Sequence, residues 1–214
     1  MKSYIFTLAI VATVFSSTAH AQSINVSVIG QIIPATCVPS LSGGGVVNYN
    51  QIPAGTLNAT SFTVLESKSL ALTISCDSPV ALAISAIDNA AGSRVPGITK
   101  ALGWQYTDGY NFGLGTVSGA NVGGFIMGLS AVTVDGTVHG MIASRNDGAT
   151  WAFDGGGFVV DGTVLTSWGT TTPIVGTTIT GNMFIHAVLN KAADLPLTAD
   201  VPLAGSGTLT LVYL

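Results

Sequence analysis

Apolar and polar residues alternate along much of this chain with a period of two, which predicts β-strands. The two clearest alternating runs lie at opposite ends of the sequence. Near the N-terminus, one face of the predicted strand carries Ile24, Val26, Val28, Gly30 and Ile32. Near the C-terminus, the run from residue 207 to residue 214 alternates up to the penultimate position. Both ends of the chain are therefore predicted to be strands.

The middle of the sequence predicts several further strands separated by glycine-rich turns. Residues 70–76 alternate, and Pro79 is expected to end that strand before the next one at residues 80–87. An Asp-Gly pair at 135–136 between two apolar runs, 125–134 and 137–143, predicts a β-hairpin. Further strands are expected at residues 158–165, 177–180 and 183–189. No segment shows capped, helical periodicity, so we expect one all-β domain of the sandwich or barrel type.

The first 21 residues have the pattern of a secretory signal peptide. Lys2 is followed by an apolar run at residues 4–15 and by small residues that end in Ala-x-Ala at Ala21. A membrane span needs about 20 apolar residues, and this run is shorter. We therefore expect residues 1–21 to be cleaved and a chain of 193 residues to be exported.

The composition narrows the range of partners. Charged residues make up 7% of the chain, and removal of Lys2 with the leader leaves five basic and ten acidic residues, a net charge of −5. A chain without a basic patch is not expected to bind nucleic acid. The mean hydropathy of +0.59 is high for a chain with no later spanning segment. This value indicates that much of the surface is covered in the working state, for example by copies of the same chain.

Two cysteines, Cys37 and Cys76, remain in the mature chain. In an exported protein an even number of cysteines predicts a disulfide, and here only one pairing is possible. Such a bond would close a loop of about 40 residues and contribute roughly 4 kcal/mol in the chain-entropy model.

The sequence carries no pattern typical of an active site. The two mature histidines, His139 and His186, lie in separate predicted strands, and neither a nucleophile elbow nor a phosphate-binding loop is present. We expect no catalytic residue, no metal site and no cofactor. One aromatic group, Trp104, Tyr106 and Tyr110, lies in a predicted loop. It is interpreted as loop packing, with a sugar-stacking surface as the alternative.

The two ends of the sequence together resemble the pilus subunits of the bacterial chaperone–usher pathway. The features that carry the resemblance are a signal peptide, an alternating N-terminal extension with Gly30 in its apolar row, the pair Cys37 and Cys76, and the penultimate Tyr213. The middle contains "FGLG" at 112–115, "GGFIMGLSAV" at 123–132 and "SRNDGATW" at 144–151, and is similar to a branch described as beta-fimbrial subunits. The chain is longer than the commonest major pilins, which predicts an inserted hairpin or loop.

The resemblance implies an incomplete immunoglobulin-like β-sandwich over residues 34–214 that lacks its last strand. The extension, residues 22–33, would fill the groove of a neighbouring subunit, with the row Ile24, Val26, Val28, Gly30 and Ile32 as the donor strand. A periplasmic chaperone would occupy the groove first and recognise the C-terminal strand through Leu209, Leu211 and Tyr213. An outer-membrane usher would then exchange the chaperone for the next subunit. The product would be a head-to-tail fimbria on the cell surface.

Other interpretations of the same sequence remain open at this stage. The first strand could complete the chain's own sheet instead of a neighbour's. The whole chain could be a small outer-membrane β-barrel, which fits the signal peptide, the glycine content and the alternating last strand. It could also be a secreted β-sandwich lectin or adhesin, although no binding site for such a role is visible in the sequence.

Overall fold

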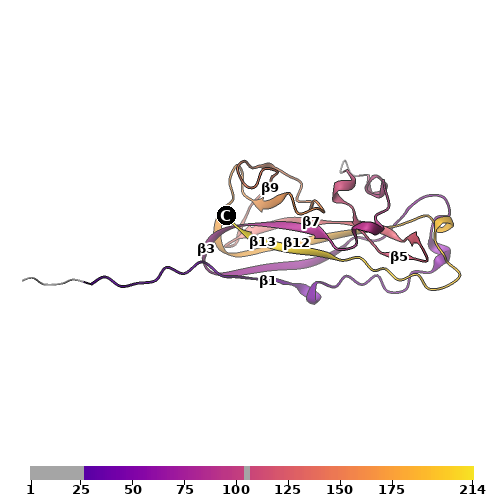
Figure 1. Ribbon diagram of the computed structural model, residues 1–214, viewed down its shortest axis with the longest axis horizontal. Coiled ribbons are helices and arrows are strands. Elements are labelled where there is room, and N and C mark those ends of the chain that lie inside the picture. The colour runs from indigo at the N-terminus through magenta and orange to yellow at the C-terminus, as the bar shows by residue number, and fades with distance from the viewer. Residues whose placement is uncertain (1–26, 104–106) are drawn as a thin grey trace, which may run out of the picture. The chain divides into compact units, whose positions relative to one another are not determined.

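The computed structural model describes residues 27–103 and 107–214, and this part of the chain is built from β-strands (Figure 1). The chain divides into two units, residues 1–33 and residues 34–214. In the first unit, residues 27–33 belong to no helix or strand. The helical segments of the described residues are single 3-10 turns of three to five residues. The all-β prediction is therefore confirmed. No helix in the described ranges is long and apolar enough to cross a membrane.

The strands of the second unit differ greatly in length. They are β1 (Cys37–Leu41), β2 (Thr63–Val64), β3 (Lys68–Asp88), β4 (Phe112–Gly113), β5 (Thr116–Val117), β6 (Ala120–Asn121), β7 (Gly123–Val134), β8 (Thr137–Val138), β9 (Met141–Ser144), β10 (Ala152–Phe153), β11 (Leu165–Trp168), β12 (Val175–Leu189) and β13 (Gly207–Tyr213). The 3-10 turns are η1 (Ser42–Gly45), η2 (Ala54–Thr56), η3 (Ala91–Ser93), η4 (Ile98–Leu102), η5 (Asp108–Tyr110) and η6 (Ala192–Asp194).

The long strand β3 joins the two halves of a curled sheet whose main order is β10-β9-β11-β3-β12-β7-β4. Its first half pairs with β1 and β12, and its second half pairs with β13 and β11. The expected break at Pro79 is wrong, because β3 continues through it. The pairing with β12 instead shifts register near the proline, where Ser75 faces Thr178 and Val80 faces Gly176. The proline thus marks the point where the strand changes partners, and does not end it.

The hairpin at the Asp-Gly pair is confirmed, but the expected second strand at 137–143 is divided into β8 and β9, and only β8 belongs to the hairpin. β7 and β8 pair antiparallel, and the two turn residues, Asp135 and Gly136, have φ angles of 48° and 83°. Positive φ at both positions is the requirement of a type I′ turn, which matches the twist of the strands. The Asp135 carboxylate also accepts hydrogen bonds from the backbone N–H groups of Thr177 and Thr178, and these bonds lower its pKa.

Two other strand predictions are corrected by the structure. The runs at 177–180 and 183–189 are one strand, β12, because Gly181 and Asn182 stay in the ladder. The run at 158–165 is not a continuous strand. An isolated bridge precedes it at Gly157, another lies within it at Asp161, and β11 begins only at Leu165.

The core lies between the two halves of the curled sheet. In the first half of β3, Leu70, Leu72 and Ile74 are buried and the residues between them are not, as the alternation predicts. The largest fully buried side chains are Trp168, Phe112 and Phe158. Phe112 stacks on Phe125 with ring centroids 5.1 Å apart. One side of this core is not closed by a strand, and that side forms the candidate site.

Candidate functional site

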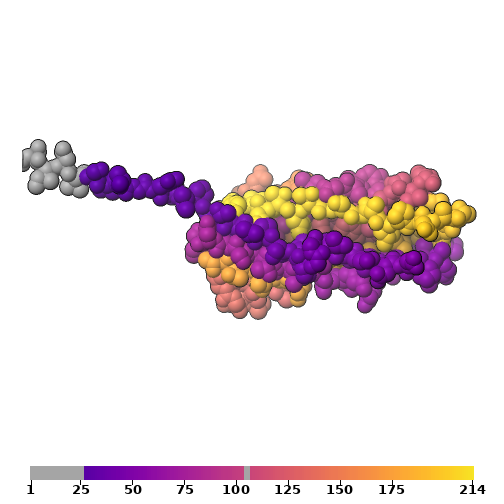
Figure 2. All heavy atoms as spheres, turned by 90° about the horizontal axis from the view of Figure 1, so that it is seen from below, coloured from indigo at the N-terminus to yellow at the C-terminus, as the bar shows by residue number. Residues whose placement is uncertain are grey.

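An elongated groove of about 1500 Å³ opens into the core of the second unit. One wall consists of β1 and residues 44–57, and the other consists of residues 195–211, which include most of β13. Figure 2 shows these walls as an indigo and a yellow band along one face. The floor contains Leu70 and Leu72 of β3, Phe125 and Met127 of β7, and Met183 and Ile185 of β12. Among the described residues that line the groove, Asp200 is the one that carries a charge.

The β13 wall has an unpaired backbone edge. β13 pairs only with β3 among the described strands, and bonds at Ser206–Asn89 and Leu214–Ala81 fix the pattern of that ladder. In an antiparallel ladder, residues that hydrogen-bond to the partner strand alternate with residues whose N–H and C=O groups point away from that strand. The even-numbered residues of β13 therefore bond to β3. The odd-numbered residues, Gly207, Leu209 and Leu211, direct their N–H and C=O groups toward the groove.

The same odd-numbered residues place their side chains in the groove. The row that lines it is Leu203, Gly205, Gly207, Leu209 and Leu211. A Cβ atom on Gly205 would lie 2.8 Å from the Phe125 ring, and one on Gly207 would lie 2.7 Å from the terminal methyl of Met127. Both distances are too short for a side chain. The Phe125 ring and the Met127 methyl group therefore lie against the wall at these two glycines, which leaves no room there for a side chain from the wall.

The opposite wall begins at the disulfide. Cys37 and Cys76 are bonded, as predicted from the cysteine count. Directly beside them, the N–H of Thr36 donates to Oδ1 of Asp77 over 2.9 Å, and the N–H of Asp77 donates to the Thr36 carbonyl over 3.0 Å. The bond from Thr36 lowers the pKa of Asp77. Together these links fix the first residue of β1 against β3.

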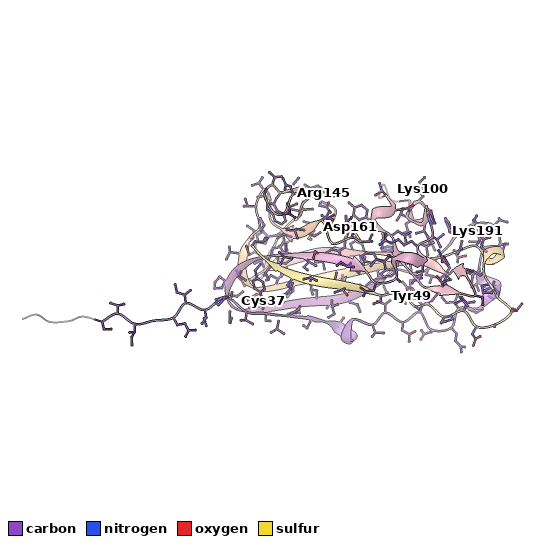
Figure 3. All side chains as sticks on the ribbon, in the orientation of Figure 1. Cys37, Tyr49, Lys100, Arg145, Asp161 and Lys191 are labelled. Atoms are coloured by element: carbon purple, nitrogen blue, oxygen red, sulfur yellow. A yellow bond between two sulfur atoms is a disulfide. The ribbon has the colours of Figure 1, made fainter. Side chains whose placement is uncertain are left out.

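One end of the groove is closed by Tyr213. The backbone N–H of Cys37 donates to the hydroxyl of Tyr213 over 2.9 Å, so the start of β1 is tied to the end of β13. The groove-lining residues stop just short of this contact, at Pro39 on one wall and Leu211 on the other. Figure 3 shows Cys37 at this end and Tyr49 farther along the same wall. Burial raises the pKa of Tyr49, which also lines the groove.

Of the predicted site residues, those on β13 lie with the disulfide at one end of the groove, and the described donor residues lie in the extension. Leu209, Leu211 and Tyr213 lie together on β13, and the disulfide lies at the same end of the body. In the extension, Val28 is 93% exposed and Ile32 is 99% exposed. The predicted donor residues Ile24 and Val26 lie outside the described residues, and Gly30 has nothing within 4 Å of an added Cβ.

The remaining candidates are not brought to the groove. His186 lies in β12 with Nε2 3.1 Å from the Ser67 hydroxyl, and its pKa is lowered by burial. His139 lies between β8 and β9. Of the aromatic loop group, Trp104 and Tyr106 lie outside the described residues. Tyr110 accepts a hydrogen bond from Arg145 over 3.1 Å.

The wall formed by residues 44–57 was not predicted from the sequence pattern. This stretch contains apolar residues at Val47, Tyr49, Ile52 and Leu57, which pack against the core. They are spaced irregularly among glycine, asparagine and proline, so no period marks them as a wall. The available signal was the number of large apolar residues in a stretch with no predicted strand.

Comparison with known proteins gives relatives without a stated function. Residues 26–126 match the family model described as "Protein of unknown function (DUF1120)". The chain is 25% identical to Protein GltF of Escherichia coli (strain K12), over 88% of this chain and 87% of that protein. It is 31% identical to Uncharacterized protein YhcF of the same organism, over 38% of this chain and 34% of that protein. Neither name states a function, so the resemblance to pilus subunits stays a prediction.

Proposed function

We propose that this protein is a structural subunit of a surface fimbria that polymerises by donor-strand exchange. In this proposal, the N-terminal extension of one copy fills the groove of the next copy. The observation that supports it best is the combination of an apolar groove with an unpaired strand edge and an alternating extension in the same chain. An open edge over an apolar groove is the arrangement that accepts a strand by β-strand addition.

The extension and the groove match in length and pattern. The five donor positions, 24 to 32, and the five positions of the groove-lining row, 203 to 211, which ends in β13, would each extend over about 26 Å at roughly 3.3 Å per residue. In an antiparallel alignment with Ile24 opposite Leu211, Gly30 comes opposite Gly205. The residue without a side chain then meets the part of the groove where the Phe125 ring lies against the wall. A parallel alignment would place Gly30 opposite Leu209 instead.

The antiparallel direction also gives a contact that repeats. The extension joins the body just before Cys37, at the end of the groove that Tyr213 closes. A donor that runs antiparallel to β13 keeps its N-terminus near the acceptor's Tyr213 and places its own body at the acceptor's opposite end. Every subunit then repeats the same orientation. A heterologous contact of this kind extends into a filament and does not close into a dimer.

The apolar residues of the extension provide the driving force. Burial of each large apolar side chain of the donor row contributes about 1.5–3 kcal/mol, so Ile24, Val26, Val28 and Ile32 together contribute roughly 6–12 kcal/mol. The backbone ladder with β13 adds hydrogen bonds that neither strand makes alone. A joint of this strength dissociates slowly, which is what a fibre under load requires.

The proposal includes the export route implied by the resemblance. The finer fold, an immunoglobulin-like sandwich without its last strand, would leave this groove open in a single subunit. In the periplasm, a chaperone would cover the groove and contact Leu209, Leu211 and Tyr213, and an outer-membrane usher would guide the exchange. The exposed apolar groove supports this requirement, because an uncovered patch of this kind promotes aggregation.

The test is non-reducing electrophoresis of the purified protein without boiling. A donor-strand polymer gives an SDS-resistant ladder that collapses to one band after boiling. The matched variant, Gly30→Trp, should lose the ladder and still bind the chaperone, because only its donor strand is changed. A single band from unboiled wild-type protein, or a normal ladder from Gly30→Trp, would contradict the proposal.

A further inference from the structure

We infer that the outer face of the sheet made by β1, β3, β12, β7 and β8 is a second self-association surface, through which fibres of this protein pack side by side. The outer face is the one that points away from the core and from the groove. The inference rests on the proposed function, because it concerns polymerised fibres. It adds a contact between copies that donor-strand exchange does not use.

The register of the five strands aligns three rows of side chains on this face. The strands pair antiparallel in the order β1-β3-β12-β7-β8, and residues directly opposite each other point to the same side. Since Leu72 and Ile74 of β3 are buried in the core, the residues next to them on the strand point outward. The central row is Ser40, Thr73, Thr180, Thr133 and Val138. The two shorter rows are Val38, Ser75 and Thr178, and Ala71, Asn182 and Ser130.

None of the residues in these three rows carries a charge. A solvated surface normally mixes charges of both signs, at roughly a quarter of its positions. The acids at one border of the face, Asp77 and Asp135, use their carboxylates to accept hydrogen bonds from the backbone N–H groups of Thr36 and Thr178. The face therefore lacks the exposed charges that keep two copies apart.

Several polar groups of the face already have partners within the same sheet. The hydroxyls of Thr133 and Thr180 bond to each other over 2.7 Å. Those of Ser40 and Ser130 donate to backbone carbonyls of the neighbouring strands, each over 3.3 Å. A hydroxyl that keeps its hydrogen bond can be removed from water at little cost. Two exposed valines complete the face, Val38 at 66% and Val138 at 71% exposure. The face is thus suited to be covered by another surface.

The occupant that fits this face is a second copy of the chain. After removal of the leader, five basic and ten acidic residues give each copy a net charge of −5, so copies repel one another through most of their surfaces. Two uncharged faces are where that repulsion is smallest. In addition, β1 is both the first strand of this face and part of a groove wall, so the face borders the joint between successive subunits.

The size of the face determines which copies associate. Five strands about 4.8 Å apart and three rows about 6.6 Å apart give roughly 500 Å² per copy. A stable pair of proteins needs about 800 Å² per partner, so two single subunits do not stay together through this face. Along two fibres the same contact recurs at every subunit, and the many weak contacts add. The surface therefore joins fibres, and not free subunits.

The experiment compares purified fibres of the wild type, Asn182→Lys and Thr171→Lys by low-speed sedimentation and negative-stain electron microscopy. Asn182 is exposed in the middle strand of the face, and Thr171 is exposed in the loop between β11 and β12. Both changes bring the net charge of a copy closer to zero by the same amount. Only Asn182→Lys places like charges opposite each other in the inferred contact, and this should lower the amount of pelleted fibre at least about tenfold. Wild-type and Thr171→Lys fibres should form bundles.

Salt provides a second readout on the wild-type fibres. The Debye length falls from about 30 Å at 0.01 M to about 8 Å at 0.15 M salt, which screens the repulsion between acidic copies. Bundling through an uncharged face should therefore increase between these two concentrations. Bundles that dissolve at the higher concentration would show a contact made by ion pairs, and would overturn the inference.

The unboiled electrophoresis ladder separates this inference from the proposed function. A ladder from all three proteins, with single fibres from the wild type or with equal bundling of Asn182→Lys, would overturn the inference and leave donor-strand exchange intact. If Asn182→Lys alone gives no ladder, the substitution has disturbed the subunit, and Val138→Lys on the short strand β8 decides by the same comparison. If the wild type gives no ladder, there are no fibres, and both the proposed function and this inference are wrong.

Discussion

Replacement of Ile32 by alanine tests the donor role of the extension, and the same replacement of its neighbour Ile33 is the control. Ile32 is in the donor row and is 99% exposed, while Ile33 is outside that row and is 70% exposed. In a single subunit, neither side chain is buried, so neither substitution should change the free energy of unfolding measurably. The two variants differ only in the polymer, where Ile32 is predicted to enter the groove of the next copy.

The expected size of the effect follows from the buried carbon atoms. The change from isoleucine to alanine removes three carbons, worth about 2.4 kcal/mol at roughly 0.8 kcal/mol per buried carbon. If this free energy is lost from the bound state, the dissociation rate rises about 50-fold, because each 1.4 kcal/mol is about tenfold. For Ile33→Ala, the side chain stays on the outer face, and the rate should change less than about threefold.

The assay is the rate at which a labelled peptide of residues 22–33, in its wild-type, Ile32→Ala and Ile33→Ala forms, leaves the groove after dilution into excess unlabelled peptide. All three peptides have the same length and charge, so these properties cannot account for a difference between their dissociation rates. Equal rates for the two alanine peptides would refute the assignment of faces in the extension. A larger effect from Ile33→Ala would show that the strand binds with the opposite face inward.

Three further outcomes are expected. Gly205→Ala should destabilise the subunit by about 1–3 kcal/mol in urea unfolding, since its Cβ would lie 2.8 Å from the Phe125 ring. The control Gly92→Ala, with open space around the new Cβ, should be neutral within about 0.5 kcal/mol. Equal effects of the two substitutions would contradict the close packing of Gly205 against Phe125. Asp77→Asn should reduce the loss of thermal stability on acidification: the folded-state pKa of Asp77 is lowered, so its contribution is complete above the ordinary aspartate value and is lost below about pH 4 as the carboxylate protonates, while the share of Asp135 remains. An unchanged pH profile would exclude this role. Removal of residues 213–214 should lower the periplasmic level of the protein in immunoblots, and an undiminished level would argue against the role of this end in chaperone recognition.

The sequence predicted those features that are encoded locally. The type I′ turn at Asp135 and Gly136 and the alternation of Leu70, Leu72 and Ile74 depend on neighbouring residues, and both are found in the structure. The disulfide followed from the count of cysteines, since only one pairing was possible.

Features that depend on contacts between distant segments were not predictable in this way. The bond between Cys37 and Tyr213 joins residues 176 positions apart, and nothing in either neighbourhood encodes it. The continuation of β3 through Pro79 depends on the change of partners from one half of the sheet to the other. The alternation predicted the last strand, but the reason for glycine at positions 205 and 207, the close approach of Phe125 and Met127, required the fold.

Donor-strand exchange places the extension of one copy beside β13 of another, and a designed cross-link tests this contact. In the antiparallel alignment, the outward-facing pair is Ser27 and Thr208, both exposed, and the described chain has no free cysteine to interfere. Directly opposite residues of a non-bonded antiparallel pair have Cα atoms about 4.5 Å apart, within the range of a disulfide. The double variant Ser27→Cys with Thr208→Cys, oxidised and boiled without reductant, should give a ladder of covalent multimers. Ser27→Cys with Thr210→Cys, one step out of register, should give much less. Cross-linked multimers from neither pair, or a band shift confined to the monomer, would contradict donor-strand exchange in this protein.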